Sequence, residues 1–173
     1  MKKQNLIASY LLVLVVAFSR LAPHPFGFTP IGALGLFAGT YMHNRWSLCV
    51  PLVALLIGDA ITGFYNSVVM VSVYIGFAAS AFIGKVLLSR KRTFVRMGSA
   101  IFVSALIFFI SSNLGAWWVH YPHTTEGLLL CYLKGVPYFG RGMLADIFYC
   151  AILFGAYEWF QHWSLHDSDA KTI

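Results

Sequence analysis

Four polar residues lie within or beside strongly apolar stretches and are the best candidates for chemistry: Arg20, Asp59, Asn113 and Asp146. A charge at the centre of a bilayer costs roughly 2.5–3.5 kcal/mol on insertion scales, so such residues usually face the interior of a helix bundle and have partners. Arg20 could pair with either aspartate. The four residues therefore indicate either a structural ion pair that holds helix ends together or the polar floor of a ligand pocket. With two carboxylates and one arginine, the pocket could bind a cation or accept hydrogen bonds from an uncharged ligand.

Aromatic residues cluster in the segments that would form the walls of this pocket. Trp117 follows Asn113 by four residues, which places both on one face of a helix. We expect Trp117 and His24 at the rim. Aromatic walls with few directed polar groups suit a planar or ring-containing small molecule. The alternative is an interfacial belt, because Trp and Tyr gather at membrane interfaces without binding a ligand. The other aromatic candidates are Phe26, Phe28, Tyr65, Trp118, Tyr121, Tyr132, Tyr138 and Phe139.

Catalysis finds no support in the motifs of the chain. There is no GxSxG or HExxH motif and no phosphate-cradling glycine loop. We therefore expect no catalytic residue and no cofactor. Three histidines could hold zinc, but an HxxH spacing in a loop without a fourth ligand is a weak signal, and we expect no metal. These histidines are His24, His120 and His123.

The elements that position these residues are predicted from hydropathy. Apolar residues make up 59% of the 173 residues and charged ones 10%, against roughly 25% charged in an ordinary soluble domain. A helix needs about 20 residues to cross ~30 Å of hydrocarbon. Six apolar runs reach or approach this length: 5–19, 27–43, 47–64, 68–88, 97–118 and 142–163. We expect an all-α bundle of six transmembrane helices that forms a single integral membrane domain over 1–173.

The cations are sorted between the two sides that six crossings define. Nine lie on the side of the termini, namely Lys2, Lys3, Arg45, Lys85, Arg90, Lys91, Arg92, Arg96 and Lys171, and three on the other, namely Arg20, Lys134 and Arg141. This bias places both termini in the cytoplasm and predicts a multi-pass protein of the bacterial inner membrane. The net charge of +6 does not point to nucleic acid, because the cluster at 90–96 lies between two spans, where it can touch anionic lipid head groups.

The segment between the last two predicted spans contains conflicting signals. The apolar stretch Gly127–Leu133 is too short to cross a membrane. Pro137 and Gly140 follow it, and proline removes a backbone donor from a helix. We therefore expect an interfacial or folded-back helix in the 120–140 segment that caps the outer end of the bundle, and a break before the last span.

Four segments carry a family resemblance: Phe18–Pro25, Phe28–Ala33, Gly58–Tyr65 and Ser112–Trp117. They resemble a bacterial family of small membrane proteins of unknown function that are described as transport proteins. That family is in turn similar in size and six-span layout to the substrate-binding S components of energy-coupling factor transporters. The second similarity implies a vitamin-like ligand bound from outside and delivered inward with a separate energising transmembrane partner and ATPases.

The sequence therefore predicts a small-molecule transporter, or its substrate-binding component, that is not an enzyme. Its expected partners are the lipid bilayer, a small-molecule ligand and an energising transmembrane/ATPase module, and no nucleic acid. The alternatives are a structural or assembly partner of an envelope complex and, less favoured, a membrane enzyme. The predicted substrate-binding residues are Arg20, His24, Asp59, Asn113, Trp117 and Asp146.

Overall fold

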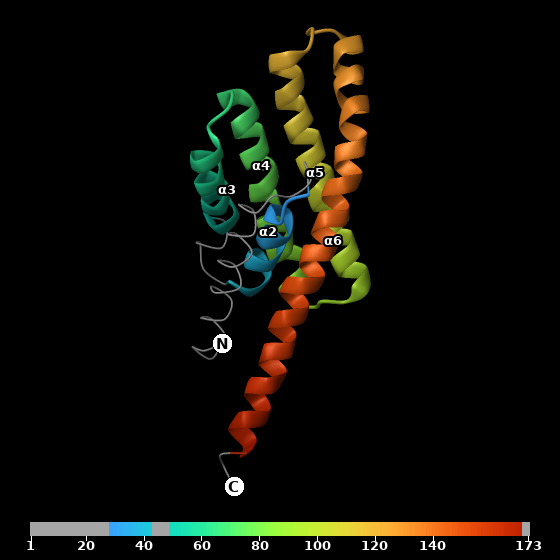
Figure 1. Cartoon of the computed structure of the whole chain (residues 1–173). Helices are drawn as coiled ribbons and strands as arrows, with labels where there is room; N and C mark the ends of the chain where they lie inside the picture. The colour runs from blue at the N-terminus through green and yellow to red at the C-terminus, as the bar shows by residue number, and fades with distance from the viewer. Residues whose placement is uncertain (1–27, 43–48, 171–173) are drawn as a thin grey trace.

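The computed structural model describes residues 28–42 and 49–170, and every regular element within them is a helix (Figure 1). The elements are α2 (Ile31–Tyr41), α3 (Cys49–Thr62), α4 (Ser67–Ile83), the π-helix η2 (Gly84–Leu88), α5 (Phe94–His120) and α6 (Thr125–Ala170). This confirms the all-α class. The predicted first span, 5–19, lies outside the described residues.

Among the described residues, three helical segments are long and apolar enough to cross a membrane: Ser67–Leu88, Phe94–His120 and Thr125–Trp163. Their length and composition indicate a membrane protein. The helices α2 and α3 are shorter, with 11 and 14 residues. At 1.5 Å per residue they measure roughly 16 and 21 Å, less than the ~30 Å of hydrocarbon. The expectation that 27–43 and 47–64 each form a full-length spanning helix is therefore not supported.

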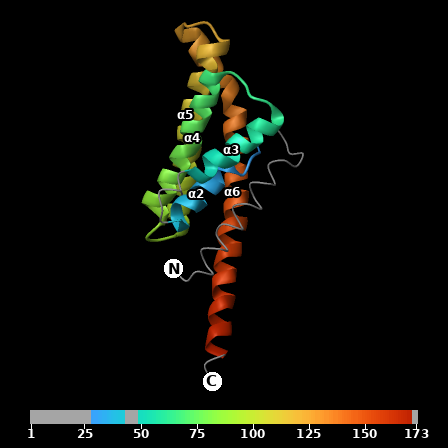
Figure 2. The same cartoon turned by 90° about the vertical axis from the view of Figure 1, so that its left-hand side faces the viewer.

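The short helix α2 lies at the centre of the bundle. Every one of its residues is buried, and it contacts α3, α4, α5 and α6 (Figure 2). A helix that is apolar on all sides needs such surroundings. Its glycines allow backbones to touch, since a side chain at Gly39 would collide with the backbone of α4 at Ala81. In the same way, Gly84 lies against the backbone of α2 at Leu36. These close contacts of small residues serve packing within the bundle.

The last helix contradicts the predicted break at Pro137 and Gly140. The helix α6 is continuous over 46 residues with Pro137 inside it, so 120–140 is no separate cap. Its first part packs along α5, where the Tyr132 hydroxyl donates to the Ile110 carbonyl at 2.9 Å. Proline is tolerated within membrane helices because neighbouring groups make up for the lost backbone bond. The hydrophobic run of 127–133 is therefore the start of the last helix.

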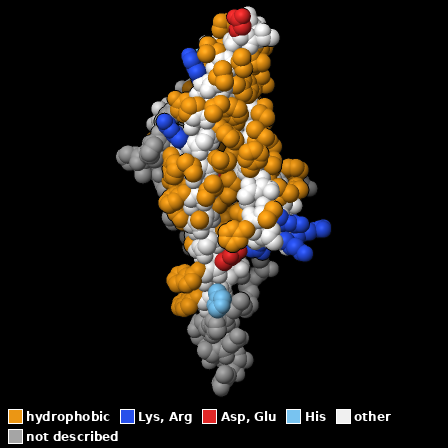
Figure 3. All heavy atoms as spheres, turned by 90° about the vertical axis from the view of Figure 1, so that its right-hand side faces the viewer, with side chains coloured by type: hydrophobic (Ala, Val, Ile, Leu, Met, Phe, Trp, Pro, Cys, Tyr) orange, Lys and Arg blue, Asp and Glu red, His pale blue; other side chains and the backbone are white. Residues whose placement is uncertain are grey.

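The outer surface matches a bilayer environment. Hydrophobic side chains cover most of the face shown in Figure 3, where Lys and Arg form a group at the right-hand edge and lie singly toward the upper left. Exposed apolar residues on α5 and α6 include Phe102, Ile110, Leu133, Leu144 and Phe148.

The helix ends are capped by polar side chains, since Asn66 accepts from the Val68 N–H and Thr93 from the Arg96 N–H. Such caps satisfy backbone donors that the first helical turn leaves free.

Candidate functional site

A cavity of about 560 Å³ lies among α3, α4, α5 and α6, beside the start of α2. It brings together three of the predicted site residues: Asp59 from α3, Asn113 from α5 and Asp146 from α6. The rest of the lining is aromatic, aliphatic and hydroxylic. It comprises Thr29, Gly32, Leu55, Tyr65, Val73, Phe77, Ser104, Ala105, Phe108, Phe109, Ser112, Gly135, Tyr138, Phe139, Gly142 and Met143.

Asp146 connects this cavity to the amino-terminal end of α2. Its side chain is 7% exposed and packs directly over Gly32, where a side chain would collide with the carboxylate. The carboxylate accepts a hydrogen bond from the backbone N–H of Ala33. Because the first N–H groups of a helix have no partner within it, an acceptor from α6 caps α2 and complements the positive end of its dipole. On the other side of this end, Thr29 Oγ1 accepts from the Ile31 N–H at 3.2 Å.

Asp59 forms the acidic wall on the side of α3. It is 2% exposed, and its Oδ2 accepts a hydrogen bond from the Tyr74 hydroxyl at 3.0 Å. Tyr74 belongs to α4, so the contact ties the end of the short α3 to a long helix. A buried carboxylate needs donors around it. Tyr74 supplies one such donor to Asp59.

Asn113 lies at the contact between α5 and α6. Its Nδ2 donates to the Phe109 carbonyl at 2.8 Å, within its own helix. Its amide lies so close to Gly135 that a side chain there would collide with it. Cys131 also approaches, with Sγ donating to the Asn113 carbonyl at 3.4 Å. The lack of a side chain at Gly135 therefore gives the amide its place on the cavity wall.

The remaining lining follows a regular pattern on two helices. On α5 it recurs at positions 104, 105, 108, 109, 112 and 113, and on α6 at 135, 138, 139, 142, 143 and 146. Spacings of three, four and seven mark one face of an α-helix. The sequence prediction missed Ser104, Ser112 and the glycines on these faces, although this periodicity extends from Asn113 and Asp146.

Trp117 does not line the cavity with its predicted neighbour Asn113. It lies beside the α5–α6 turn, where its Nε1 donates to the Pro122 carbonyl at 3.0 Å and its ring packs on His123. Trp117 is therefore absent from the lining of this cavity, and its predicted part in substrate binding stays a prediction. Arg20, His24 and Phe26 lie outside the described residues.

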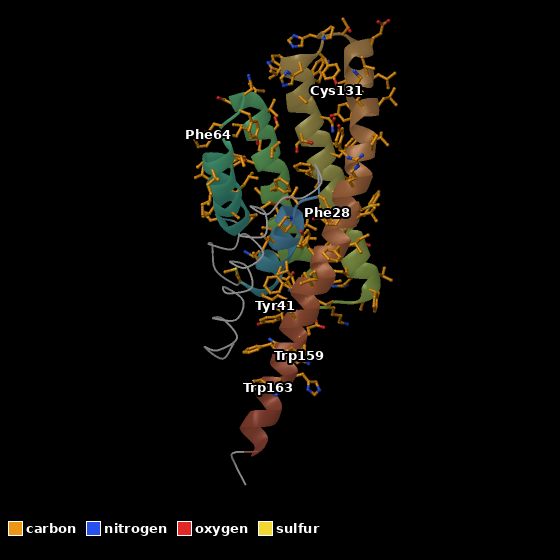
Figure 4. The ribbon with its side chains drawn as sticks, viewed as in Figure 1. Phe28, Tyr41, Phe64, Cys131, Trp159 and Trp163 are labelled. Atoms are coloured by element: carbon orange, nitrogen blue, oxygen red, sulfur yellow. The ribbon has the colours of Figure 1, made fainter. Side chains whose placement is uncertain are left out.

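The predicted aromatic walls are partly in place. Tyr65, Tyr138 and Phe139 line the cavity. Phe28 instead packs against Phe148 and Tyr149, between α2 and α6 (Figure 4). The others also make different contacts: Trp118 stacks on His123, Tyr121 lies under the Lys134 ammonium, and Tyr132 packs on Phe109.

His123 of the α5–α6 turn packs against Trp117 and Trp118. His123 Nε2 lies 2.8 Å from the Trp118 carbonyl. Within 28–42 and 49–170, His, Cys, Asp and Glu side chains form no group of three or more that could hold a metal ion. The cavity lining offers hydrogen-bond acceptors, hydroxyls and aromatic surfaces, which are the groups that bind a small molecule.

Comparison with known proteins places the chain in a family. The model of a family of unknown function, DUF6580, matches residues 1–167. The chain belongs to this family. The match covers every residue that lines the cavity. No curated protein and no solved structure matches the chain.

Proposed function

We propose that this member of the DUF6580 family binds a small molecule in the membrane and takes part in its transport. The observation that carries the proposal is the cavity with two buried carboxylates and an amide, Asp59, Asp146 and Asn113, among aromatic side chains. Its volume of about 560 Å³ falls within the roughly 300–1,000 Å³ of ligand pockets. A structural or assembly partner needs packed helices at this place and no such cavity.

The lining favours a ligand with a ring or chain and several hydrogen-bond donors. Both carboxylates and the Asn113 side-chain oxygen are acceptors, while Phe108, Phe109 and other rings supply flat apolar surface. A protonated amine or a vitamin-like heterocycle with N–H groups has this chemistry. The role is non-catalytic, and it agrees with the resemblance to S components, which implies that a separate transmembrane/ATPase module supplies the energy.

The proposed topology puts the 89–93 loop in the cytoplasm, together with both termini of a multi-pass inner-membrane protein. The cation bias supports this orientation. In it α4 runs inward, α5 outward and α6 inward, and the cavity opens to the outside. The six-crossing layout requires α2 and α3 to complete their passage with non-helical ends, which a membrane permits only where protein covers them. The full burial of α2 agrees with that requirement.

A cysteine-labelling experiment tests the topology. Cys49, Cys131 and Cys150 are first replaced by serine, and single cysteines are then introduced at His123 and Lys91. A thiol label that cannot cross membranes should reach position 123 in intact cells and position 91 only after the membrane is opened. The opposite pattern would invert the orientation, and labelling of both in intact cells would remove these helices from the membrane.

Ligand binding is tested on the full chain purified from its host. Native mass spectrometry should show a co-purifying small molecule on the wild type and on Glu126→Gln, which neutralises an exposed carboxylate outside the cavity. Asp59→Asn keeps the shape but weakens the acceptor, so occupancy should fall about tenfold or more, in line with the cost of a lost charged hydrogen bond. Ser104→Leu should narrow the cavity and weaken binding.

The melting temperature separates this proposal from a structural clamp. A clamp predicts that Asp59→Asn lowers the melting temperature while uptake per folded molecule stays at the wild-type value. Binding predicts reduced occupancy and uptake in folded Asp59→Asn and Ser104→Leu proteins. Unchanged occupancy in both folded variants would end the ligand-site proposal.

A further inference from the structure

A second cavity lies at the opposite end of the bundle and has the opposite charge. It measures about 600 Å³ and is lined by three cations, Lys85, Arg90 and Arg96. The other lining residues are Gly39, Thr40, Met42, Phe82, Val86 and Ser89. None of them lines the acidic cavity. The two cavities are therefore separate sites on the same bundle.

The local fold explains why the cations face a hollow. The helix α4 continues directly into the π-helix η2, Gly84–Leu88, and π-helical turns often occur at functional sites. Its first glycine lies against α2, and the Gly84 carbonyl accepts from the Thr40 hydroxyl at 3.4 Å. Lys85 follows at once. The chain then turns through Ser89 and Arg90 into α5, which contributes Arg96 from its first turn.

A neighbouring arginine of the same loop is used in another way. Arg92 Nη1 donates to the Tyr41 hydroxyl at 2.6 Å, its guanidinium lies 4.7 Å from the centre of that ring, and it lies 3.9 Å from the Glu158 carboxylate. Figure 4 shows Tyr41 beside α6, where this network ties α2 to the last helix. Arg92 thus has a structural role, whereas Lys85, Arg90 and Arg96 form no ion pair within the described residues.

The apolar part of this cavity lies next to the lipid-facing surface. Phe82 is 60% and Val86 58% exposed, and Lys85 lies between them in the chain. An anionic group held by the cations would therefore have room for an attached chain along α4. Ser89 supplies a hydroxyl for a further hydrogen bond.

We propose that the cavity bounded by Lys85, Arg90 and Arg96 binds a phosphate group. Arginine and lysine are the usual partners of phosphate oxygens, arginine with two parallel N–H donors. Two sources share this chemistry: the head group of an anionic phospholipid and a free phosphate or phosphorylated solute. The exposed Phe82 and Val86 favour the lipid. The site is independent of the ligand proposed for the acidic cavity.

The test uses the full chain in detergent and equal amounts of dioleoyl-phosphatidylglycerol and dioleoyl-phosphatidylcholine. Native mass spectrometry should show preferential retention of phosphatidylglycerol by the wild type. Lys85→Gln and Arg96→Gln should each lower its association constant about fivefold, the effect of one cation near a phosphate surface. Lys91→Gln is the matched control, because Lys91 has the same charge in the same loop but does not line the cavity.

Inorganic phosphate and glycerol phosphate distinguish the two sources. If phosphatidylglycerol raises the wild-type melting temperature and neither inorganic phosphate nor glycerol phosphate does, the site binds lipid. If inorganic phosphate or glycerol phosphate raises it and Arg96→Gln removes that rise, the site binds a soluble ligand. Equal retention of both lipids together with no response to phosphate would overturn the proposal. So would an equal loss in Lys91→Gln, which indicates diffuse charge. The wild-type competition requires no variant, so a misfolded variant leaves the proposal testable.

Discussion

The contact between α2 and the α4 segment and the contact between α5 and α6 use small residues in different ways. In the first, Gly39 and Gly84 let one backbone rest on the other. In the second, Gly135 and Gly142 alternate with rings such as Tyr138 and Phe139, and this face lines a cavity of about 560 Å³. Small residues on both partners close a contact. Small residues that alternate with large ones keep part of it open, and polar groups can then face the hollow.

The largest effect should come from placing a large side chain in the closed contact. Gly39→Leu would drive a side chain into the backbone of α4 at Ala81 and of η2 at Lys85, and a helix backbone cannot move aside as a flexible side chain can. We expect a loss of about 3 kcal/mol or more, the upper range for overpacking. The measurement is the melting temperature and the yield of monodisperse protein in detergent.

Gly140→Leu is the control for this prediction. Gly140 is also helical, but a Cβ there meets nothing within 4 Å. Leucine has the higher helix propensity, by up to about 1 kcal/mol, so stability should stay constant or rise. Equal losses in both variants would show that the contact between α2 and α4 is no tighter than an open helix face.

A smaller effect should follow from removing the Asp146 carboxylate, which caps the amino-terminal end of α2. Asp146→Leu and Asp146→Asn have similar shapes, but only asparagine can still accept from the Ala33 N–H. The leucine variant should therefore be less stable than the asparagine variant by about 1–2 kcal/mol, the cost of a lost cap with a buried donor. Thermal melting of the two proteins checks this. Equal melting temperatures would limit Asp146 to a role in the cavity.

The polar part of the site could be predicted because polar groups are costly in apolar runs. Asp59, Asn113 and Asp146 each interrupt such a run, so burial on a shared interior was the expected outcome. Gly32 and Gly135 were missed because their role depends on which carboxylate or amide lies opposite. Ser104 is equally silent, since serine is common in membrane helices and its neighbours decide whether it faces a cavity.

The helix count was harder to predict, since hydropathy does not set where a helix begins and ends. The run 27–43 has the composition of a span, yet only Ile31–Tyr41 is helical within the described part of it. Because protein surrounds this short helix on every side, the helix does not need to span the membrane by itself. The segment after the fifth predicted span was expected to form a separate helix in 120–140 with a break before the last span, whereas α6 is continuous from Thr125. The free-energy cost of proline within helices of soluble proteins overstates the cost of Pro137, because another helix packs alongside it.

The smallest expected effect concerns that proline in the open contact. Pro137→Ala restores a backbone N–H within α6, and alanine is the better helix former, but the gain in a packed membrane helix should stay below the ~3 kcal/mol seen in water. We expect a rise in melting temperature of a few degrees at most, with unchanged labelling at position 123. Pro137 adjoins Tyr138 on the cavity wall, so ligand occupancy is measured in parallel. A lower melting temperature would mean that the proline fixes a bend on which the cavity depends, because alanine removes the ring and leaves the rest of the helix able to straighten.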